Sequence, residues 1–365
     1  MTDAALSVTT LGAALLVSAA ASAACIPLGW RLGRVSRTDA ARAGPGGIPV
    51  TGGLAVLAGF AAGLAARALA GAHAAVGLAA REGAWAAAQA APSTWPAWSG
   101  TQTAALVLLV CGFWAIGWID DRRPLAPGLR LVLEAVCASL SAVLFLAGGA
   151  VSGPAGAGTL AAAAPLACGA VVGANALNMI DNSDGLAAGM GALTCAALAL
   201  AGRGGPLFAA AAGGLAGFWL FNLPPARLYL GDHGALPLGA LTGAGLAWLA
   251  VPSLSGLRAS LGVPAALLAA GYLIADPFHT LAFRVIEGRR PWIGGIDHLS
   301  HDLARAAGAW APALSAALLV QLGSTALAAL LVRGRIGGQA AWAALGAWLV
   351  LLAGCACLRR PHPRV

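Results

Sequence analysis

The chain has 365 residues, of which 59% are hydrophobic and 9% are charged, and its mean hydropathy is +0.82. This composition excludes a soluble protein with one or two cores and indicates a polytopic membrane protein. The formal net charge is +8 and every basic side chain is an arginine, but no basic soluble module is present, so nucleic-acid binding is not expected. The seven cysteines lie in or beside apolar runs and are interpreted as small apolar side chains.

Apolar runs of about 20 residues, bounded by polar residues or by glycine and proline, are expected to cross the bilayer as helices. Because the sixth to eighth runs are short, a count of ten or twelve spans is an alternative to eleven. The prediction is an all-α fold in a single integral membrane domain over residues 1–365, without internal repeats. The eleven runs are 5–29, 47–71, 101–119, 129–150, 159–179, 186–201, 207–223, 235–251, 263–285, 311–333 and 338–358.

The distribution of arginine predicts the orientation, because arginine is favoured in cytoplasmic loops. With the N-terminus outside and the C-terminus in the cytoplasm, cytoplasmic arginines outnumber outer ones by about two to one. Most acidic residues then fall on the cytoplasmic side as well, and a shared active site there would explain their collection. The alanine-rich stretch 69–100 would lie outside as a short surface helix with tryptophan anchors. The cytoplasmic arginines would be Arg31, Arg34, Arg37, Arg42, Arg122, Arg123, Arg227, Arg289, Arg290, Arg305, Arg359, Arg360 and Arg364.

Two polar elements precede the centre of the chain. The segment 45–53, Pro-Gly-Gly-Ile-Pro-Val-Thr-Gly-Gly, is either a flexible turn or a set of backbone N–H groups that face a phosphate at a helix N-terminus. Asp120 and Asp121 end the third run and are followed by two arginines. The four charges could form a solvated helix end. However, adjacent carboxylates repel unless a cation is near, and clusters rich in oxygen suit Mg²⁺ or Mn²⁺.

The most polar stretch in the apolar part of the chain runs from Asn175 to Gly185. Asn175 and Asn178 share a helix face, and Asp181 and Asp184 repeat the same spacing beyond them. Carboxamides offer the paired donors and acceptors that a uracil edge needs, and aspartate can bind a metal or a ribose hydroxyl. A helix C-cap would explain the turn residues at the end of this stretch but leaves the four polar side chains unexplained.

Asp232 stands before the eighth run, where an aspartate is usually an N-cap but can also hold a metal at the membrane surface. Asp276 lies inside the ninth run and Arg284 follows two helical turns later, so the two are expected either to pair or to line one polar cavity.

The connection between the ninth and tenth runs contains Arg289 and the segment Asp297-His-Leu-Ser-His301. His298 and His301 would share a face if the segment is helical. Two histidines at this spacing can bind zinc, but no third soft ligand is close to them. Arginine neighbours favour contact with phosphate instead.

These elements, in this order and across eleven spans, resemble the polyprenyl-phosphate N-acetylhexosamine-1-phosphate transferases. That membrane family includes phospho-N-acetylmuramoyl-pentapeptide transferase and the undecaprenyl-phosphate GlcNAc-1-phosphate transferases. The resemblance covers about residues 37–303. It implies transfer of a sugar-1-phosphate from a UDP-sugar to polyprenyl phosphate, release of UMP, and a Mg²⁺ or Mn²⁺ cofactor. It also implies a multi-pass protein of the bacterial cytoplasmic membrane with a cytoplasmic active site, and it leaves a homodimer open.

The resemblance assigns a role to each matching position. The catalytic residues would be Asp120, Asp121 and Asp232, of which the first two match the pair implicated in binding or deprotonating the acceptor phosphate. The metal ligands would be Asp232 and Asp181. The residues that bind the nucleotide or the rest of the substrate would be Asn175, Asn178, Asp181, Asp184, His298, His301, Arg130 and Arg289.

The sequence departs from the family pattern at several of these motifs. Arg130 stands where lysine is typical, and arginine does not titrate. The short His-x-x-His form is closer to the GlcNAc-1-phosphate branch, so the expected sugar is GlcNAc, with phospho-MurNAc-pentapeptide transfer as the alternative. The remaining departures are Asn182 for glycine, Ala235 for serine, Ser300 for the middle histidine and Asp302 for arginine.

Two other classes of protein share some of these features. A secondary transporter would also carry intramembrane charges, but it would be expected to show internal repeats, and only Glu134 and Asp276 lie deep in the expected spans. A catalytically inactive homologue is a further alternative, which the intact carboxylates disfavour.

Overall fold

The computed structural model describes residues 3–36, 47–82, 98–150, 157–201, 204–255, 257, 259–292, 295 and 297–356. Much of the expected surface helix within 69–100 lies outside the described residues, as do the first two residues of the 45–53 segment and the C-terminal arginines. Each of the eleven predicted apolar runs contains one or more helices over most of its length, which confirms the all-α fold. A helix satisfies its own backbone N–H and C=O groups, as a segment within a lipid bilayer must.

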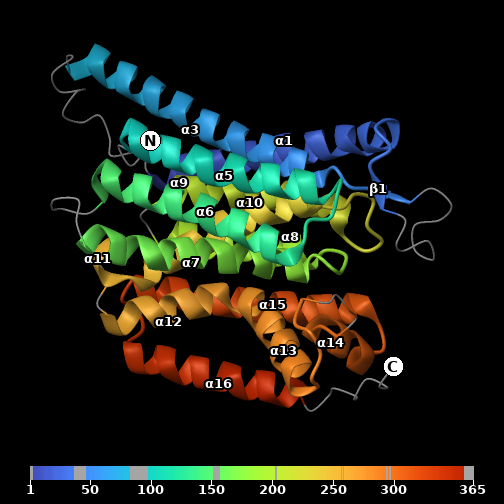
Figure 1. The fold of residues 1–365 in the computed structure, drawn as a ribbon. Coiled ribbons are helices and arrows are strands. Elements are labelled where there is room, and N and C mark those ends of the chain that lie inside the picture. Colours follow the sequence, from blue (N-terminus) through green and yellow to red (C-terminus); the bar gives the residue numbers. More distant parts are fainter. Residues whose placement is uncertain are drawn as a thin grey trace.

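Most of the long helices lie roughly parallel to one another, whereas α13 is steeply inclined, and α1 and α3 lie at one side of the bundle with α16 at the other (Figure 1). The first group is α1 (Asp3–Arg31), α3 (Gly52–Glu82), α5 (Gly100–Asp120), α6 (Pro127–Phe145) with a π-helical turn (Leu146–Ala150), and α7 (Ala157–Ile180). The second is α8 (Leu186–Leu200), α9 (Gly205–Asn222) and α10 (Asp232–Ala250). The third is α11 (Pro252–Ser255), α12 (Ala259–Ala270), α13 (Tyr272–Ile286), α14 (Leu299–Ala307), α15 (Trp310–Val332) and α16 (Gly338–Ala356).

Within the described part of the chain, six helices are long and apolar enough to cross a membrane, and a bent pair makes a seventh. The chain is therefore a multi-pass membrane protein, while the count of eleven spans and the orientation stay predictions. The six helices are Ser7–Arg31, Gly52–His73, Gly100–Asp120, Pro127–Gly149, Leu160–Ile180 and Trp310–Val332.

The bent pair consists of α12 and α13, which meet at 79°. Gly271 forms the corner with a φ of 44°, a conformation that favours glycine. Gln321 of α15 binds both sides of the corner. Its Oε1 accepts the Tyr272 N–H at 2.7 Å, and its Nε2 donates to the Ala269 carbonyl at 2.9 Å. The backbone groups at the break are thus bonded by a neighbouring helix, as the bilayer demands.

Helices α7 and α10 approach each other through glycines. Gly169 and Gly173 on α7 face Gly239 and Gly243 on α10, and a Cβ on any of the four would collide with the opposite backbone. Two small residues separated by three positions, on both helices, allow the backbones to touch, and van der Waals packing then holds them together in lipid. This contact places the end of α7 directly beside the beginning of α10.

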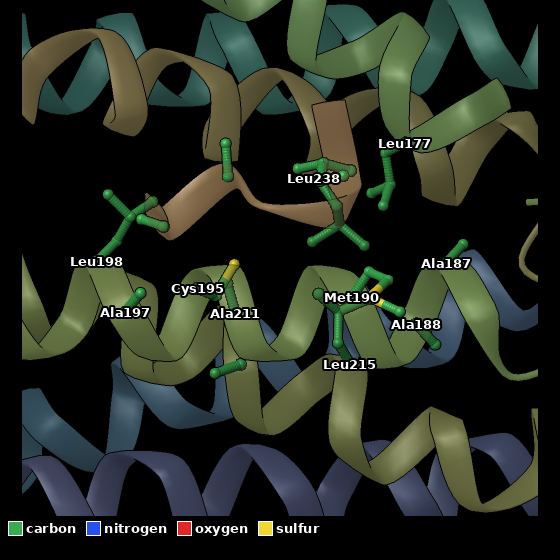
Figure 2. Close-up of a cluster of buried hydrophobic side chains, with 14 of the residues drawn as sticks. Leu177, Ala187, Ala188, Met190, Cys195, Ala197, Leu198, Ala211, Leu215 and Leu238 are labelled. Atoms are coloured by element: carbon green, nitrogen blue, oxygen red, sulfur yellow. The ribbon is translucent and has the colours of Figure 1, made fainter. Parts of the chain in front are cut away.

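Fully buried apolar side chains join α7 and α10 to α8 and α9 (Figure 2). Leu177, Met190, Leu215 and Leu238 come from these four helices in chain order, and each is 2% exposed or less. Such a tightly packed core keeps the helices in one arrangement. It fixes the helix ends on which the polar motifs lie.

A short hairpin closes one end of this unit. Strands β1 (Val35–Ser36) and β2 (Ile48–Pro49) pair antiparallel, and Val50 bridges to Tyr229 just before α10. The Tyr229 carbonyl accepts the Gly52 N–H at 2.9 Å. The connection from α1 to α3 is thereby attached to the loop that carries the Gly231-Asp232 motif.

Candidate active site

The polar motifs meet because four helices begin or end at the same end of the bundle. Asp120 is the last residue of α5, and Arg130 lies in the first turn of α6. Asn175 and Asn178 occupy the last two turns of α7, and Asp232 is the first residue of α10. The close approach of α7 and α10 turns these separate sequence motifs into one polar cluster.

Arg130 is at the centre of this cluster. Its Nη1 donates to Asp120 Oδ2 at 2.8 Å and to Asp232 Oδ2 at 3.3 Å, and its Nε donates to Glu134 Oε1 at 3.0 Å. The side chain of Glu134 is fully buried. One guanidinium therefore holds three carboxylates from three helices, which the planar fork of arginine allows.

The two carboxamides complete the same network. Asn178 Oδ1 and Asn175 Oδ1 accept from Arg130 Nη2 at 2.9 and 3.3 Å. Their amide groups donate onward, from Asn178 to Asp232 Oδ1 at 2.6 Å and from Asn175 to Glu134 Oε2 at 2.5 Å. Both asparagines thus orient carboxylates in this structure, and the expectation that they contact the nucleotide stays a prediction.

Asp121 has a different environment from Asp120. Its carboxylate accepts the backbone N–H groups of Asp232 and His233 at 3.1 and 3.2 Å, and it contacts His233 Nδ1 at 2.5 Å. It therefore caps the N-terminus of α10 from another helix, where the helix dipole favours a negative charge. Arg34 lies 3.7 Å from the same carboxylate. Asp121 thus fixes the start of α10, while Asp120 is bound to Arg130.

Asp181 and Asp184 lie in the turn between α7 and α8. Asp184 Oδ2 accepts the Ala226 N–H at 3.0 Å, and the Asp184 carbonyl accepts from Trp310 Nε1 at 2.9 Å. Burial and the negative charges of Asp232 and Asp121 raise the pKa of Asp181 well above its usual value. The excess of negative charge around Asp181 indicates a place where a cation would be favoured.

A cavity of about 550 Å³ opens beside these carboxylates. Its lining combines acidic side chains with backbone of the hairpin and of the loop before α10. The lining residues are Gly33, Arg34, Val35, Ser36, Val50, Asp121, Asp181, Asn182, Ser183, Asp184, Asn222, Tyr229, Gly231 and Asp232. The cavity is therefore a polar site that is lined by Asp181 and Asp184 of the predicted nucleotide motif and by the predicted metal ligand Asp232.

The donors of this site fit a hard divalent cation. Asp181 and Asp232 both line the cavity and offer only oxygen. Within the described residues, no three His, Cys, Asp or Glu side chains are arranged as a complete metal site. Mg²⁺ does not need such a cage, since it is commonly bound by one or two carboxylates together with water and substrate phosphates.

The histidine segment forms a second polar cluster around α13 and α14. His298 Nδ1 contacts Asp276 Oδ1 at 2.7 Å, and the rings of His298 and His301 lie 5.8 Å apart. Arg284 binds Asp297 through two hydrogen bonds of 3.0 and 2.8 Å. Of the two alternatives for Asp276 and Arg284, direct pairing does not occur among the described contacts: Asp276 contacts His298, and Arg284 binds Asp297.

Arg289 also belongs to this second cluster. Its Nη2 lies 2.6 Å from Asp297 Oδ2 and 2.7 Å from Glu287 Oε2. The predicted contact of Arg289 with phosphate stays a prediction, and in this structure the guanidinium is bound to carboxylates. Three of the predicted site residues therefore lie on or beside α13 and α14 and not in the network of Arg130. They are His298, His301 and Arg289.

Sequence reasoning gave no site role to Glu134, His233 or Arg34. Glu134 follows Arg130 by four positions on one helix, a spacing that predicts contact. His233 and Arg34 contact Asp121 only because three distant segments meet at the end of the bundle. No local pattern in the sequence indicates those contacts.

Comparison with known proteins gives matches over the segment that builds the first cluster. Residues 103–251, from α5 to the end of α10, match the model of glycosyl transferase family 4. A Streptomyces coelicolor protein named as a glycosyltransferase is 37% identical over 180 residues, which cover 46% of this chain and 42% of that protein.

Two further relatives are named phospho-N-acetylmuramoyl-pentapeptide-transferase. The one from Thermosynechococcus vestitus is 37% identical over 163 residues, 39% of this chain and 43% of the relative. The one from Heliobacterium modesticaldum is 52% identical over 82 residues, 20% of this chain and 26% of the relative. The chain thus matches less than half the length of these relatives. These matches support the resemblance drawn from the motifs: residues 103–251 are similar to glycosyl transferase family 4, and the matched relatives are named as transferases.

Proposed function

We propose that the chain transfers a HexNAc-1-phosphate from a UDP-sugar to a polyprenyl phosphate and releases UMP. The observation that carries this proposal is the network of Arg130, which gathers the family's carboxylates and carboxamides beside one polar cavity. The reaction would be the first membrane step of a cell-envelope glycan pathway, at the cytoplasmic face of the bacterial inner membrane. The match of residues 103–251 to the model of glycosyl transferase family 4 supports this assignment.

The chemistry needs two anionic groups to approach each other. An oxygen of the acceptor phosphate forms a bond to the sugar-bearing phosphorus of the UDP-sugar, and the bond from that phosphorus to the UMP oxygen breaks. The acceptor phosphate is largely ionised at neutral pH, so a general base such as Asp120 contributes modestly. The main task of the site is to position both phosphates and to balance their charge.

Asp232 and Asp181 would hold a divalent cation, Mg²⁺ or Mn²⁺, at the edge of the cavity. When bound, the ion would neutralise the charge that develops on the transferred and departing phosphates. The protein's own contribution is to fix Asp232 in place. Asn178 donates to one of its oxygens, Arg130 donates to the other, and Asp121 caps the helix that begins with it.

The test is a measurement of UMP release by the full-length protein in detergent, with UDP-GlcNAc, undecaprenyl phosphate and Mg²⁺. UMP is expected with Mg²⁺ and not after chelation. Asp232→Asn and Asp120→Asn are each expected to abolish it. Cys111→Ser is the matched control, because Cys111 lies on the same helix as Asp120 but is exposed. Absence of UMP with every UDP-HexNAc would refute the proposal.

The sugar remains to be decided between two candidates. The short His-x-x-His segment favours GlcNAc, whereas the names of most of the matched relatives favour phospho-MurNAc-pentapeptide. UDP-GlcNAc and UDP-MurNAc-pentapeptide are therefore compared in the same preparation. The substrate with the higher kcat/KM identifies the branch.

A further inference from the structure

A buried carboxylate on α13, Asp276, has no role in the function proposed above. The residue lies within the bent pair that is long and apolar enough to cross the membrane, and its exposed fraction is 0%. An ionised carboxylate in such surroundings is costly unless donors surround it. The groups that contact Asp276 therefore indicate its role.

Four donors reach the two oxygens of Asp276. Oδ1 contacts His298 Nδ1 at 2.7 Å and the Thr280 hydroxyl at 3.4 Å. Oδ2 accepts the Ser300 N–H at 3.0 Å and the Tyr272 hydroxyl at 3.3 Å. The shortest contact is thus the one to the imidazole of His298. The contacts to His298 and Ser300 come from the start of α14, and those to Tyr272 and Thr280 come from α13 itself.

The geometry determines which ring nitrogen of His298 is committed. Carboxylate oxygens accept hydrogen bonds, so the 2.7 Å contact favours the form of His298 with the hydrogen on Nδ1. The ring orientation is then set, and Nε2 is the nitrogen that remains for another partner. Among the described ring contacts, the His298 ring has one neighbour, the ring of His301, which lies edge-on with 5.8 Å between the ring centroids.

We infer that Asp276 is a positioning residue that holds the His298 ring through Nδ1 and leaves Nε2 as the nitrogen that would contact a phosphate oxygen of the nucleotide sugar. The identity of that phosphate rests on the proposed function, but the orientation of the ring does not. Carboxylate groups commonly fix a histidine through one nitrogen so that the other acts on a third group. In this chain the carboxylate comes from the membrane helix and the histidine from the loop that follows it.

The first test observes the ring directly and does not depend on activity. Full-length protein labelled with ¹⁵N-histidine contains six histidines, and the spectrum of His298→Gln identifies the signals of His298. In the wild-type protein we expect Nδ1 to be protonated and its proton to be hydrogen-bonded. A neutral ring with a bare Nδ1 and a protonated Nε2 would overturn the inference.

The second test is a double-mutant cycle on UMP release. Asp276→Asn and His298→Ala are each expected to lower kcat by about 10- to 100-fold. The double variant should be no slower than His298→Ala alone, because Asp276 acts through the ring. Multiplicative losses would instead show that Asp276 only stabilises the fold.

Asp302→Asn is the matched control for the cycle. Asp302 is also buried, with 1% exposed, but it contacts Arg305 on its own helix and not the His298 ring. Its loss is expected to multiply with that of His298→Ala. If the wild-type protein releases no UMP at all, the proposed function fails, while the ¹⁵N spectrum still decides whether Asp276 holds the ring.

Discussion

At the scale of single residues, the centre of the site is a side chain that departs from the family pattern. Arg130 donates to five acceptors on four helices, namely Asp120, Glu134, Asn175, Asn178 and Asp232. A lysine ammonium has three donors on one atom and cannot span this set. The arginine therefore explains how the buried charge of Glu134 is tolerated beside two further carboxylates.

Arg130→Lys is expected to lower the rate of UMP release by about 100-fold, because the orientation of Asp120 and Asp232 is lost. It also removes the guanidinium that is bound to Glu134, so adding Glu134→Gln should restore part of the rate by removing a buried charge that has lost its ion pair. The exposed Arg123 provides the control variant Arg123→Lys. A rate for Arg130→Lys equal to that of the wild type would contradict this account.

Asp297 gives a prediction about pH. Burial opposes its ionisation, but hydrogen bonds from Arg284 and Arg289 outweigh burial and lower its pKa well below the usual value. The unfolded carboxyl has a pKa of about 3.9, so this stabilisation is complete above that pH and is lost as the pH falls below it.

The Tm of Asp297→Asn should therefore lie below that of the wild type at pH 7, by the equivalent of about 3 kcal/mol, since the substitution removes the carboxylate that is ion-paired with the buried Arg284. The difference between the two proteins should shrink as the pH is lowered from 5 to 3. Thermal unfolding in detergent at a series of pH values measures it. A difference that stays constant would mean that the ion pair does not titrate in this range.

At the scale of helices, the site depends on how closely α7 and α10 pack, because these helices carry Asn178 and Asp232. Gly173→Val would place methyl groups against the backbone of Gly239. The expected effect is a loss of about 1 to 3 kcal/mol of stability and at least a tenfold loss of UMP release. Gly323→Val on α15 is the control, since a Cβ there meets no atom within 4 Å. Equal effects of both variants would show that the packing is not what matters.

Local sequence patterns predicted the helices well and the contacts of the site only partly. The eleven apolar runs all became helix because hydrophobic length determines that choice. The corner at Gly271 was not expected, since its geometry depends on Gln321 fifty positions later. The aspartates and asparagines of the motifs were found because their spacing repeats, whereas the roles of Asp121 and Glu134 depend on neighbours that only the packed bundle supplies.

At the scale of the whole molecule, the direction in which the chain crosses the membrane is a testable prediction. The arginine bias predicts that the N-terminus is outside and that the polar cluster faces the cytoplasm. Epitope tags at the two termini of the active protein should behave oppositely in intact cells. The N-terminal tag should be accessible to antibody from outside and the C-terminal tag only after permeabilisation. The reverse pattern would move the active site to the outer face.

The corner between α12 and α13 has a mechanical consequence. A break in a membrane helix usually bends easily, but here one side chain bonds the amide on one side of the break and the carbonyl on the other. Bending would separate these groups in a solvent that offers no replacement. We therefore expect the corner to resist bending and to keep α13 at a fixed angle to α12.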